Sequence, residues 1–155
     1  MTGHNPTDRS KLGSKKHIIT DKNGIPLSTF ITSANTHDVT VATNTIDNIV
    51  IKRPSSSHNK SKHRQNLCLD KAYHSKEVEQ EIIKIGYNPH IRHRREEKIF
   101  CRKKHSARRW VVERTNSWHN RFRKLFTRYE KKAENYLGLV QFSCCIIIYR
   151  KIILG

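Results

Sequence analysis

The chain has 155 residues, and its 31 Lys and Arg outnumber 13 Asp and Glu, which gives a formal charge of +18. A single domain is expected at this length, because domains usually contain about 100–150 residues. Hydrophobic residues make up 35% of the chain, so its hydrophobic core must be built from few residues. The positive charge favours a polyanionic partner, above all nucleic acid, over an acidic small-molecule substrate or a membrane surface.

Cysteine usage and the absence of an apolar leader favour a cytoplasmic protein. The four cysteines are Cys68, Cys101, Cys144 and Cys145. No pair has the spacing of a zinc or redox motif, so the thiols are interpreted as small hydrophobic groups in a reducing compartment. The longest apolar stretch, Leu137–Tyr149, is shorter than the roughly 20 residues that span a bilayer, so no membrane partner is expected.

The first elements in chain order are a polar loop and a β-hairpin. Residues 1–16 show no periodicity and are predicted to be a loop. Two short runs, residues 17–20 and 25–32, are predicted strands, since Asn23-Gly24 supplies the positive φ angles of a tight turn between them. The elements expected next are a helix over 39–49 capped by Asp38, a strand over 66–70, a helix over 76–85 that starts after Ser75 and ends at Gly86, and a strand over 87–91.

A strongly basic segment follows. It comprises residues 92–132, which hold 16 Lys and Arg against 4 Asp and Glu. Residues 92–105 are predicted to be a basic loop, 106–126 one helix, and 133–153 an apolar C-terminal helix. The alternation of strands and helices predicts an α/β sheet flanked by helices.

One acid stands out in the helix predicted over 106–126. Val111, Trp118, Phe122 and Leu125 form an apolar stripe, and Glu113 lies on the opposite side of the helix. Arg109, Asn116 and Asn120 share the face of Glu113, and Arg114 and Arg121 flank it. The simple interpretation is a solvated acid paired with Arg109, worth about 0.3–0.5 kcal/mol.

The second interpretation is that Glu113 lies close to Asp70 in the folded chain. Asp70 is an acid at the end of an apolar strand, and a helix-borne Glu can meet it at a sheet edge. Two carboxylates among many cations suit Mg²⁺ held beside a phosphodiester.

Six runs along the chain resemble the catalytic domain of bacterial insertion-sequence transposases of the DDE type, specifically the insertion-sequence-five family. They follow the order of that family and span nearly the whole chain. The runs are Gly3–Lys15, Gly24–Leu27, Ser33–Asp38, Leu69–Tyr73, Arg108–Thr115 and Arg128–Tyr136.

This resemblance implies a ribonuclease-H-like mixed sheet flanked by helices, in which three acids bind two divalent ions. Asp70 matches the second acid and Glu113 the third, which makes both catalytic residues and ligands of Mg²⁺ or Mn²⁺. The helix signature of the family is Tyr-x2-Arg-x3-Glu-x6-Lys, and Arg109 fits its arginine. Ser106 and Asn120 stand at the Tyr and Lys positions, so Arg121 and Lys124 are candidates to replace the missing lysine.

In similar proteins the first acid lies on a first strand upstream of the run that begins at Gly3. Asp8, Asp21 and Asp38 are poor substitutes, because they are better explained as a loop residue, a turn residue and an N-cap. The chain therefore resembles the C-terminal part of a transposase lacking its first strand, either a second reading frame joined by frameshifting or a truncated remnant.

The expected function is DNA transposition by metal-dependent cleavage and strand transfer at insertion-sequence ends, incomplete in the isolated chain. Arg109, Arg114, Arg121 and Lys124 are the predicted DNA-binding residues. The expected partners are DNA, the product of an upstream reading frame and further copies of the chain. The alternative is a non-catalytic DNA-binding remnant, which would be indifferent to divalent metal.

Overall fold

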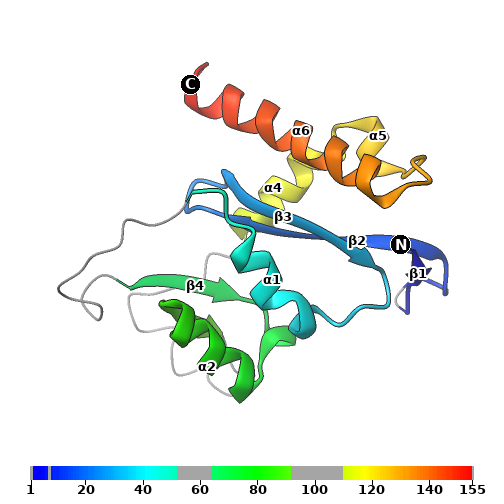
Figure 1. Ribbon diagram of the computed structural model, residues 1–155. Coiled ribbons are helices and arrows are strands. Elements are labelled where there is room, and N and C mark those ends of the chain that lie inside the picture. The colour runs from blue at the N-terminus through cyan, green and yellow to red at the C-terminus, as the bar shows by residue number, and fades with distance from the viewer. Residues whose placement is uncertain (1, 7, 52–63, 92–109, 155) are drawn as a thin grey trace. The chain divides into compact units, whose positions relative to one another are not determined.

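A computed structural model describes residues 2–6, 8–51, 64–91 and 110–154 (Figure 1). The chain divides into two compact units. The first unit comprises residues 1–37, 44–51 and 110–155, and the second comprises 38–43 and 52–109.

The first unit is built on an antiparallel sheet in the order β1-β2-β3. Its strands are β1 (Gly3–His4), β2 (Leu12–Thr20) and β3 (Pro26–Ser33). The hairpin is confirmed, but the prediction of a loop over residues 1–16 is wrong at Gly3–His4, which form β1, and from Leu12 onward. The sequence pattern missed this strand because Lys15 and Lys16 are typical of a loop. Both are only partly exposed in the strand, and the Lys15 ammonium donates to the carbonyl of Thr36 at 3.2 Å.

The turn between β2 and β3 has the chemistry that the sequence predicts. The Asp21 carboxylate accepts the backbone N–H groups of Asn23 and Ile25, both at 2.8 Å. Gly24 adopts a φ of +83°, which a side chain would disfavour. Asp21 is thereby confirmed as a turn residue.

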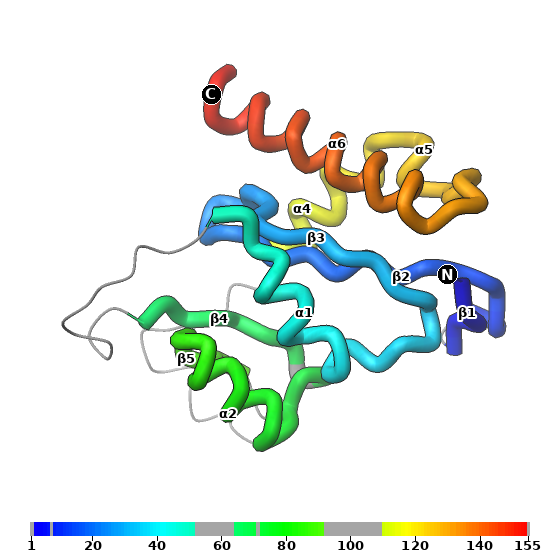
Figure 2. Tube along the Cα trace, in the orientation of Figure 1, coloured from blue at the N-terminus to red at the C-terminus, as the bar shows by residue number. Residues whose placement is uncertain are grey.

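Three helices complete the first unit (Figures 1 and 2): α4 (Trp110–Asn120), α5 (Arg123–Phe126) and α6 (Ala133–Ile152). The C-terminal helix is confirmed to within one residue. The single helix predicted over 106–126 is wrong, because the described part breaks before Arg123. Phe122 adopts an extended conformation there and packs against the core, so burial of its ring ends the helix.

The core of this unit joins α6 to the hairpin and to α5. Ile31 of β3, Leu125 of α5 and Tyr136 and Val140 of α6 form one buried cluster. The Tyr136 hydroxyl donates to the carbonyl of Leu125 at 3.2 Å, which satisfies a polar group inside the cluster. These contacts fix the C-terminal helix against the sheet.

The second unit contains a parallel strand pair, β4 (Gln65–Leu69) and β5 (Tyr87–Ile91), in which Cys68 lies opposite His90. Between them come the 3-10 turn η2 (Lys71–Tyr73) and the helix α2 (Lys76–Ile85). The two predicted strands and the predicted helix are confirmed, including the left-handed Gly86 that ends α2 with a φ of +99°, whereas η2 was not predicted. The N–H of Gly86 bonds back to the carbonyls of the last turn.

The helix predicted over 39–49 is shorter than expected. The 3-10 turn η1 (Asp38–Val41) comes first, and α1 (Ala42–Asp47) follows it across the boundary between the units. Within the first unit, the Ser28 hydroxyl donates to the carbonyl of Thr45 at 2.6 Å, which ties this segment to β3. The predicted loop over 92–105 lies outside the described residues.

Candidate functional site

Glu113 lies in the first turn of α4 with an exposed side chain. Asn116 and Asn120 are also exposed, in agreement with the polar face predicted for this helix. Arg109, the predicted neighbour of Glu113, lies outside the described residues. A carboxylate in the first turn of a helix interacts favourably with the helix dipole, so this position suits an outward-facing Glu113.

The buried face of α4 consists of Val111, Thr115 and His119. The Thr115 hydroxyl lies 2.7 Å from the carbonyl oxygen of Gly24 and 3.2 Å from that of Val111. A β-carbon on Gly24 would lie 3.1 Å from that hydroxyl, so the glycine permits the close approach. The helix turn that carries Glu113 is thereby held against the hairpin turn.

Arg114 is held beside Glu113 by three groups of its own unit. Its guanidinium donates to the carbonyl of Asn23. It also lies over the ring of Trp110 at 4.8 Å and that of Trp118 at 5.1 Å. Cation–π contacts of this kind add to the stabilisation that the hydrogen bond provides. Arg114 therefore helps to hold α4 against the hairpin turn, independently of any contact with DNA.

Beneath α4 lies a buried polar group that the sequence did not single out. His119 is fully buried, with Nδ1 2.7 Å from the Ser143 hydroxyl and Nε2 3.8 Å from the Cys144 sulfur. The Ser143 hydroxyl also lies 2.7 Å from the carbonyl of Val140. Since a hydroxyl has one proton, donation to that carbonyl leaves Ser143 to accept from Nδ1–H of a neutral imidazole.

Burial sets the protonation of this group. Burial and the neighbouring charge of Lys16 lower the pKa of His119 to about 4. Burial raises the pKa of the Cys144 thiol to about 11 and lowers that of Lys16. His119 and Cys144 are therefore neutral near pH 7 and support α4 from below without taking part in surface chemistry.

Asp70 belongs to the second unit and follows the last residue of β4. Its side chain is exposed, and its carbonyl accepts the N–H of Tyr73 at 3.0 Å. An acid that directly follows a strand and begins a tight turn has a fixed backbone, as a metal ligand requires. The strand and the position of its acid agree with the prediction.

Tyr73 reveals a second acid in the surroundings of Asp70. Burial, together with the negative charges of Asp38 and Asp70, raises the pKa of Tyr73 to about 12. Both carboxylates therefore act on one phenol within the second unit. The sequence indicates Asp38 only as a helix cap, because no spacing rule connects it with Asp70 or Tyr73, more than thirty positions away.

The carboxylates of Asp70 and Glu113 are hard oxygen donors of the kind that Mg²⁺ and Mn²⁺ prefer. In the described ranges, no group of three or more His, Cys, Asp or Glu is arranged to hold a metal. Glu113 lies in the first unit and Asp70 in the second.

Two of the predicted DNA-binding residues lie near the end of α4. Arg121 follows that helix and Lys124 lies on α5, and both side chains are exposed. Exposed cations of this kind can reach phosphates without a desolvation penalty. On the described part of the chain, Arg121 and Lys124 are therefore better placed for a polyanion than Arg114.

The comparisons with known proteins agree on one class. The model of the family described as "Transposase DDE domain" matches residues 2–148. The protein described as "Putative transposase for insertion sequence element IS402", from Burkholderia cepacia, is 38% identical over 148 residues, which cover 96% of this chain and 68% of that protein. No solved structure matches. No helix in the described part of the chain is long and apolar enough to cross a membrane.

Proposed function

The chain belongs to the transposases with a DDE domain, and on that premise we propose that it is the C-terminal part of a catalytic domain that cuts and joins DNA at the ends of an insertion sequence. DNA transposition is the process in which this family acts. The observation that carries the proposal is the exposed Glu113 carboxylate on a helix whose opposite face is fixed to the hairpin turn.

The fold that we propose is ribonuclease-H-like, in the manner of the insertion-sequence-five family, with a first strand supplied from outside these residues. The strands that the structure describes form two separate sheets, β1-β2-β3 and β4-β5. In its sheet, β4 is paired on one edge only, and an unpaired edge can accept a further strand. A strand carrying the first acid beside β4 would bring that acid near Asp70.

Asp70 and Glu113 are proposed to share the divalent ions of this site. Two bound Mg²⁺ or Mn²⁺ ions would activate the attacking oxygen and stabilise the leaving oxygen of a phosphodiester. The donor chemistry of the two carboxylates fits such ions, but two carboxylates are few for two of them. We therefore expect weak metal binding and little cleavage from the isolated chain, with full activity once the first acid is added.

The other side chains have supporting roles in this proposal. Thr115 and Arg114 hold the Glu113 turn of α4 against Asn23 and Gly24. Arg121 and Lys124, together with Arg109, would contact phosphates and so position the duplex without reading its sequence. A cytoplasmic location fits this role, and the described cysteines Cys68, Cys144 and Cys145 are free thiols. Assembly of several copies on DNA is part of the same proposal.

The test is a nicking assay on supercoiled DNA that carries the insertion-sequence ends. The chain is assayed alone and joined to the segment encoded upstream of Met1, with and without Mg²⁺. The joined protein should nick only with Mg²⁺, and Asp70→Asn and Glu113→Gln should each abolish nicking.

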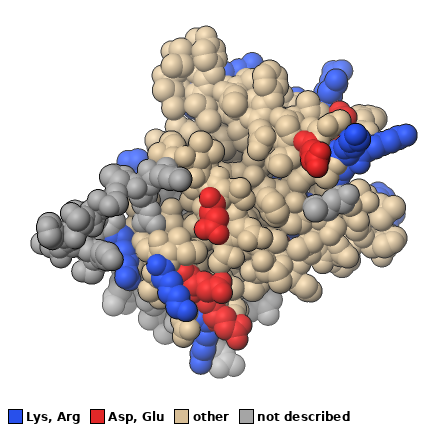
Figure 3. Space-filling view, in the orientation of Figure 1, with Lys and Arg blue, Asp and Glu red and all other residues tan. Residues whose placement is uncertain are grey.

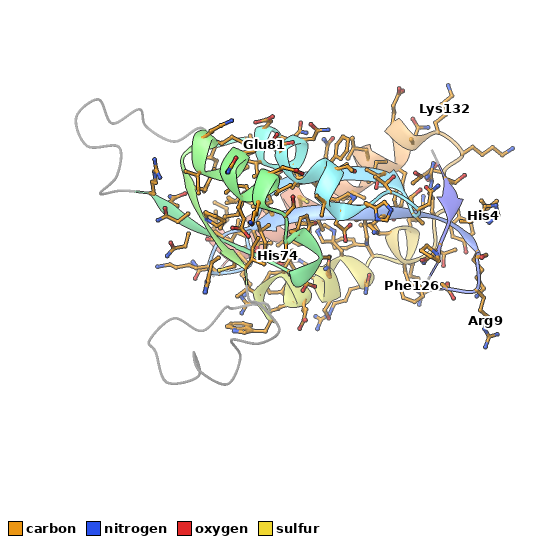
Figure 4. All side chains as sticks on the ribbon, turned by 90° about the horizontal axis from the view of Figure 1, so that it is seen from below. His4, Arg9, His74, Glu81, Phe126 and Lys132 are labelled. Atoms are coloured by element: carbon orange, nitrogen blue, oxygen red, sulfur yellow. The ribbon has the colours of Figure 1, made fainter. Side chains whose placement is uncertain are left out.

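Glu81→Gln on α2 is the matched control, because Glu81 is an exposed acid outside the proposed site (Figure 4). Nicking that survives either site variant contradicts the proposal. DNA binding without any effect of metal, in the joined protein, identifies the chain as a non-catalytic DNA-binding remnant instead.

A further inference from the structure

The C-terminal helix α6 has two apolar faces, and the first unit buries only one of them. Tyr136, Val140, Ser143, Cys144 and Ile147 face the core. At 100° per residue, the residues on the opposite side are Gly138, Phe142, Cys145, Tyr149 and Ile152, here called the outer stripe.

The outer stripe is open to solvent throughout. Phe142 is 63% exposed, Tyr149 53% and Ile152 60%, and Gly138 and Cys145 are exposed as well. Its spacing of 4, 3, 4 and 3 residues is that of the seam along which two helices interlock. A helix with a second apolar face normally buries that face as well, so the outer stripe indicates a docking surface.

Gly138 supplies an independent observation. It lies inside a helix of 20 residues, and a β-carbon added there would have nothing within 4 Å. Glycine weakens a helix interior relative to alanine, and nothing in the first unit requires the small residue. A gap on the outer stripe at this place is explained by a bulky group that enters from a partner.

Charge restricts what that partner can be. From Asn135 to Tyr149, α6 carries no charged residue, in a chain with a net charge of +18. The surface over α6 is correspondingly mostly uncharged in Figure 3. Two copies of so basic a chain repel one another elsewhere, so this helix is a surface on which they can approach without like charges meeting.

We propose that the outer stripe of α6 is the interface with a second copy of this chain, packed as an antiparallel pair of helices. With the two-fold axis between positions 143 and 144, Gly138 faces Tyr149 of the second copy, and Phe142 faces Cys145 of the second copy. A large side chain then meets a small one in both of these layers, which is how well-packed helix pairs fill space.

The ends of the helix favour the same orientation. Glu134 lies in the first turn of α6 and Arg150 in the last. An antiparallel pair brings the first turn of one copy close to the level of the last turn of the other, and it opposes the two helix dipoles. A parallel pair would align the two helix dipoles and place the two basic last turns, each with Arg150, at the same level. The proposal specifies a surface for the assembly of copies proposed above, and it depends on neither metal nor DNA.

The first test is sedimentation of the 155-residue chain, freed of nucleic acid, over a range of concentrations. Phe142→Glu should weaken dimerisation on the order of 100-fold, because the buried ring is removed twice in a two-fold interface. Phe126→Glu is the control, since Phe126 is 72% exposed on α5 (Figure 4) and should leave the dimer intact. Gly138→Leu should also weaken it, by filling the gap for Tyr149.

The second test uses disulfide formation to determine which residues of the two α6 helices face each other. Phe142→Cys should form an intermolecular disulfide with Cys145 of the second copy, because positions three apart on one helix are too distant for an internal bond. Adding Cys145→Ser should abolish the crosslink. A wild-type chain that stays monomeric overturns the proposal and leaves the stripe to another occupant. A dimer unaffected by Phe142→Glu, or a crosslink that survives Cys145→Ser, overturns it equally.

Discussion

The helices α4 and α6 rest on the same hairpin unit, yet their outward faces differ. On α4 the outward face carries Glu113 with two exposed asparagines, and on α6 it carries an uncharged apolar stripe. The inward faces meet each other, since His119 of α4 bonds Ser143 of α6. Burial thus explains one face of each helix, and for the other face we have proposed a partner: ions and DNA for α4, a second copy of the chain for α6.

The largest expected effect concerns the outward face of α4. In the protein joined to its upstream segment, Glu113→Gln should lower the rate of nicking about 1,000-fold, because a metal ligand is worth several kcal/mol in the transition state. The free energy of unfolding should change by less than about 1 kcal/mol, since Glu113 is exposed and interacts with the helix dipole in the first turn of α4. Single-turnover nicking and urea unfolding measure the two quantities. A large loss of stability would mean that Glu113 serves the fold.

The stability of the packing between the inward faces of α4 and α6 should decrease at low pH. The pKa of His119 is about 4 in the folded chain and about 6.5 when unfolded, so the unfolded state binds the proton first as the pH falls. The stability present above pH 6.5 is therefore lost progressively down to pH 4, by up to about 3 kcal/mol. Lys16 and Cys144 are the titratable neighbours. Urea unfolding at a series of pH values measures this loss, and His119→Gln should remove it.

The packing of α4 on the hairpin turn depends on a glycine. Gly24→Ala should lower the free energy of unfolding by about 2 kcal/mol, because alanine disfavours positive φ and its β-carbon would crowd Arg114 and Thr115. Thermal unfolding followed by circular dichroism measures the change. An unchanged melting temperature would show that α4 is not held by this turn.

The glycine on α6 should behave in the opposite way. Gly138→Ala should raise the free energy of unfolding by about 1 kcal/mol at concentrations too low for association, because the added methyl group meets open space. Unfolding at nanomolar and at high micromolar concentration separates monomer stability from association. Destabilisation in the dilute sample would mean that Gly138 is packed inside the monomer.

The smallest effect concerns phosphate binding near the end of α4. Replacing both Arg121 and Lys124 by Ala should reduce the slope of log affinity against log salt by about 2, because each cation that neutralises a phosphate adds close to one unit to that slope. Lys84→Ala, on α2 in the second unit, is the control and should leave the slope unchanged. Fluorescence anisotropy with duplex DNA measures it. Equal slopes for all variants would remove both residues from the interface.

The sequence predicted elements whose signals are local. The hairpin turn at Asp21–Gly24 and the end of α2 at Gly86 follow from backbone conformations that few residues adopt. The start of β2 and the break before α5 were missed, because they depend on packing against residues distant in sequence. The same reason hid His119 and the influence of Asp38 on Tyr73, which arise only when separate segments pack together.

We propose that Asp70 and Glu113 hold a common divalent ion, and Mn²⁺ titration of the chain followed by electron paramagnetic resonance tests this proposal most directly. We predict that Asp70→Asn and Glu113→Gln each weaken Mn²⁺ binding about tenfold and that the double variant binds little worse than either single one, since both remove the same site. Glu81→Gln should bind as the wild type does. Independent effects that multiply in the double variant, or no effect at all, would contradict the account.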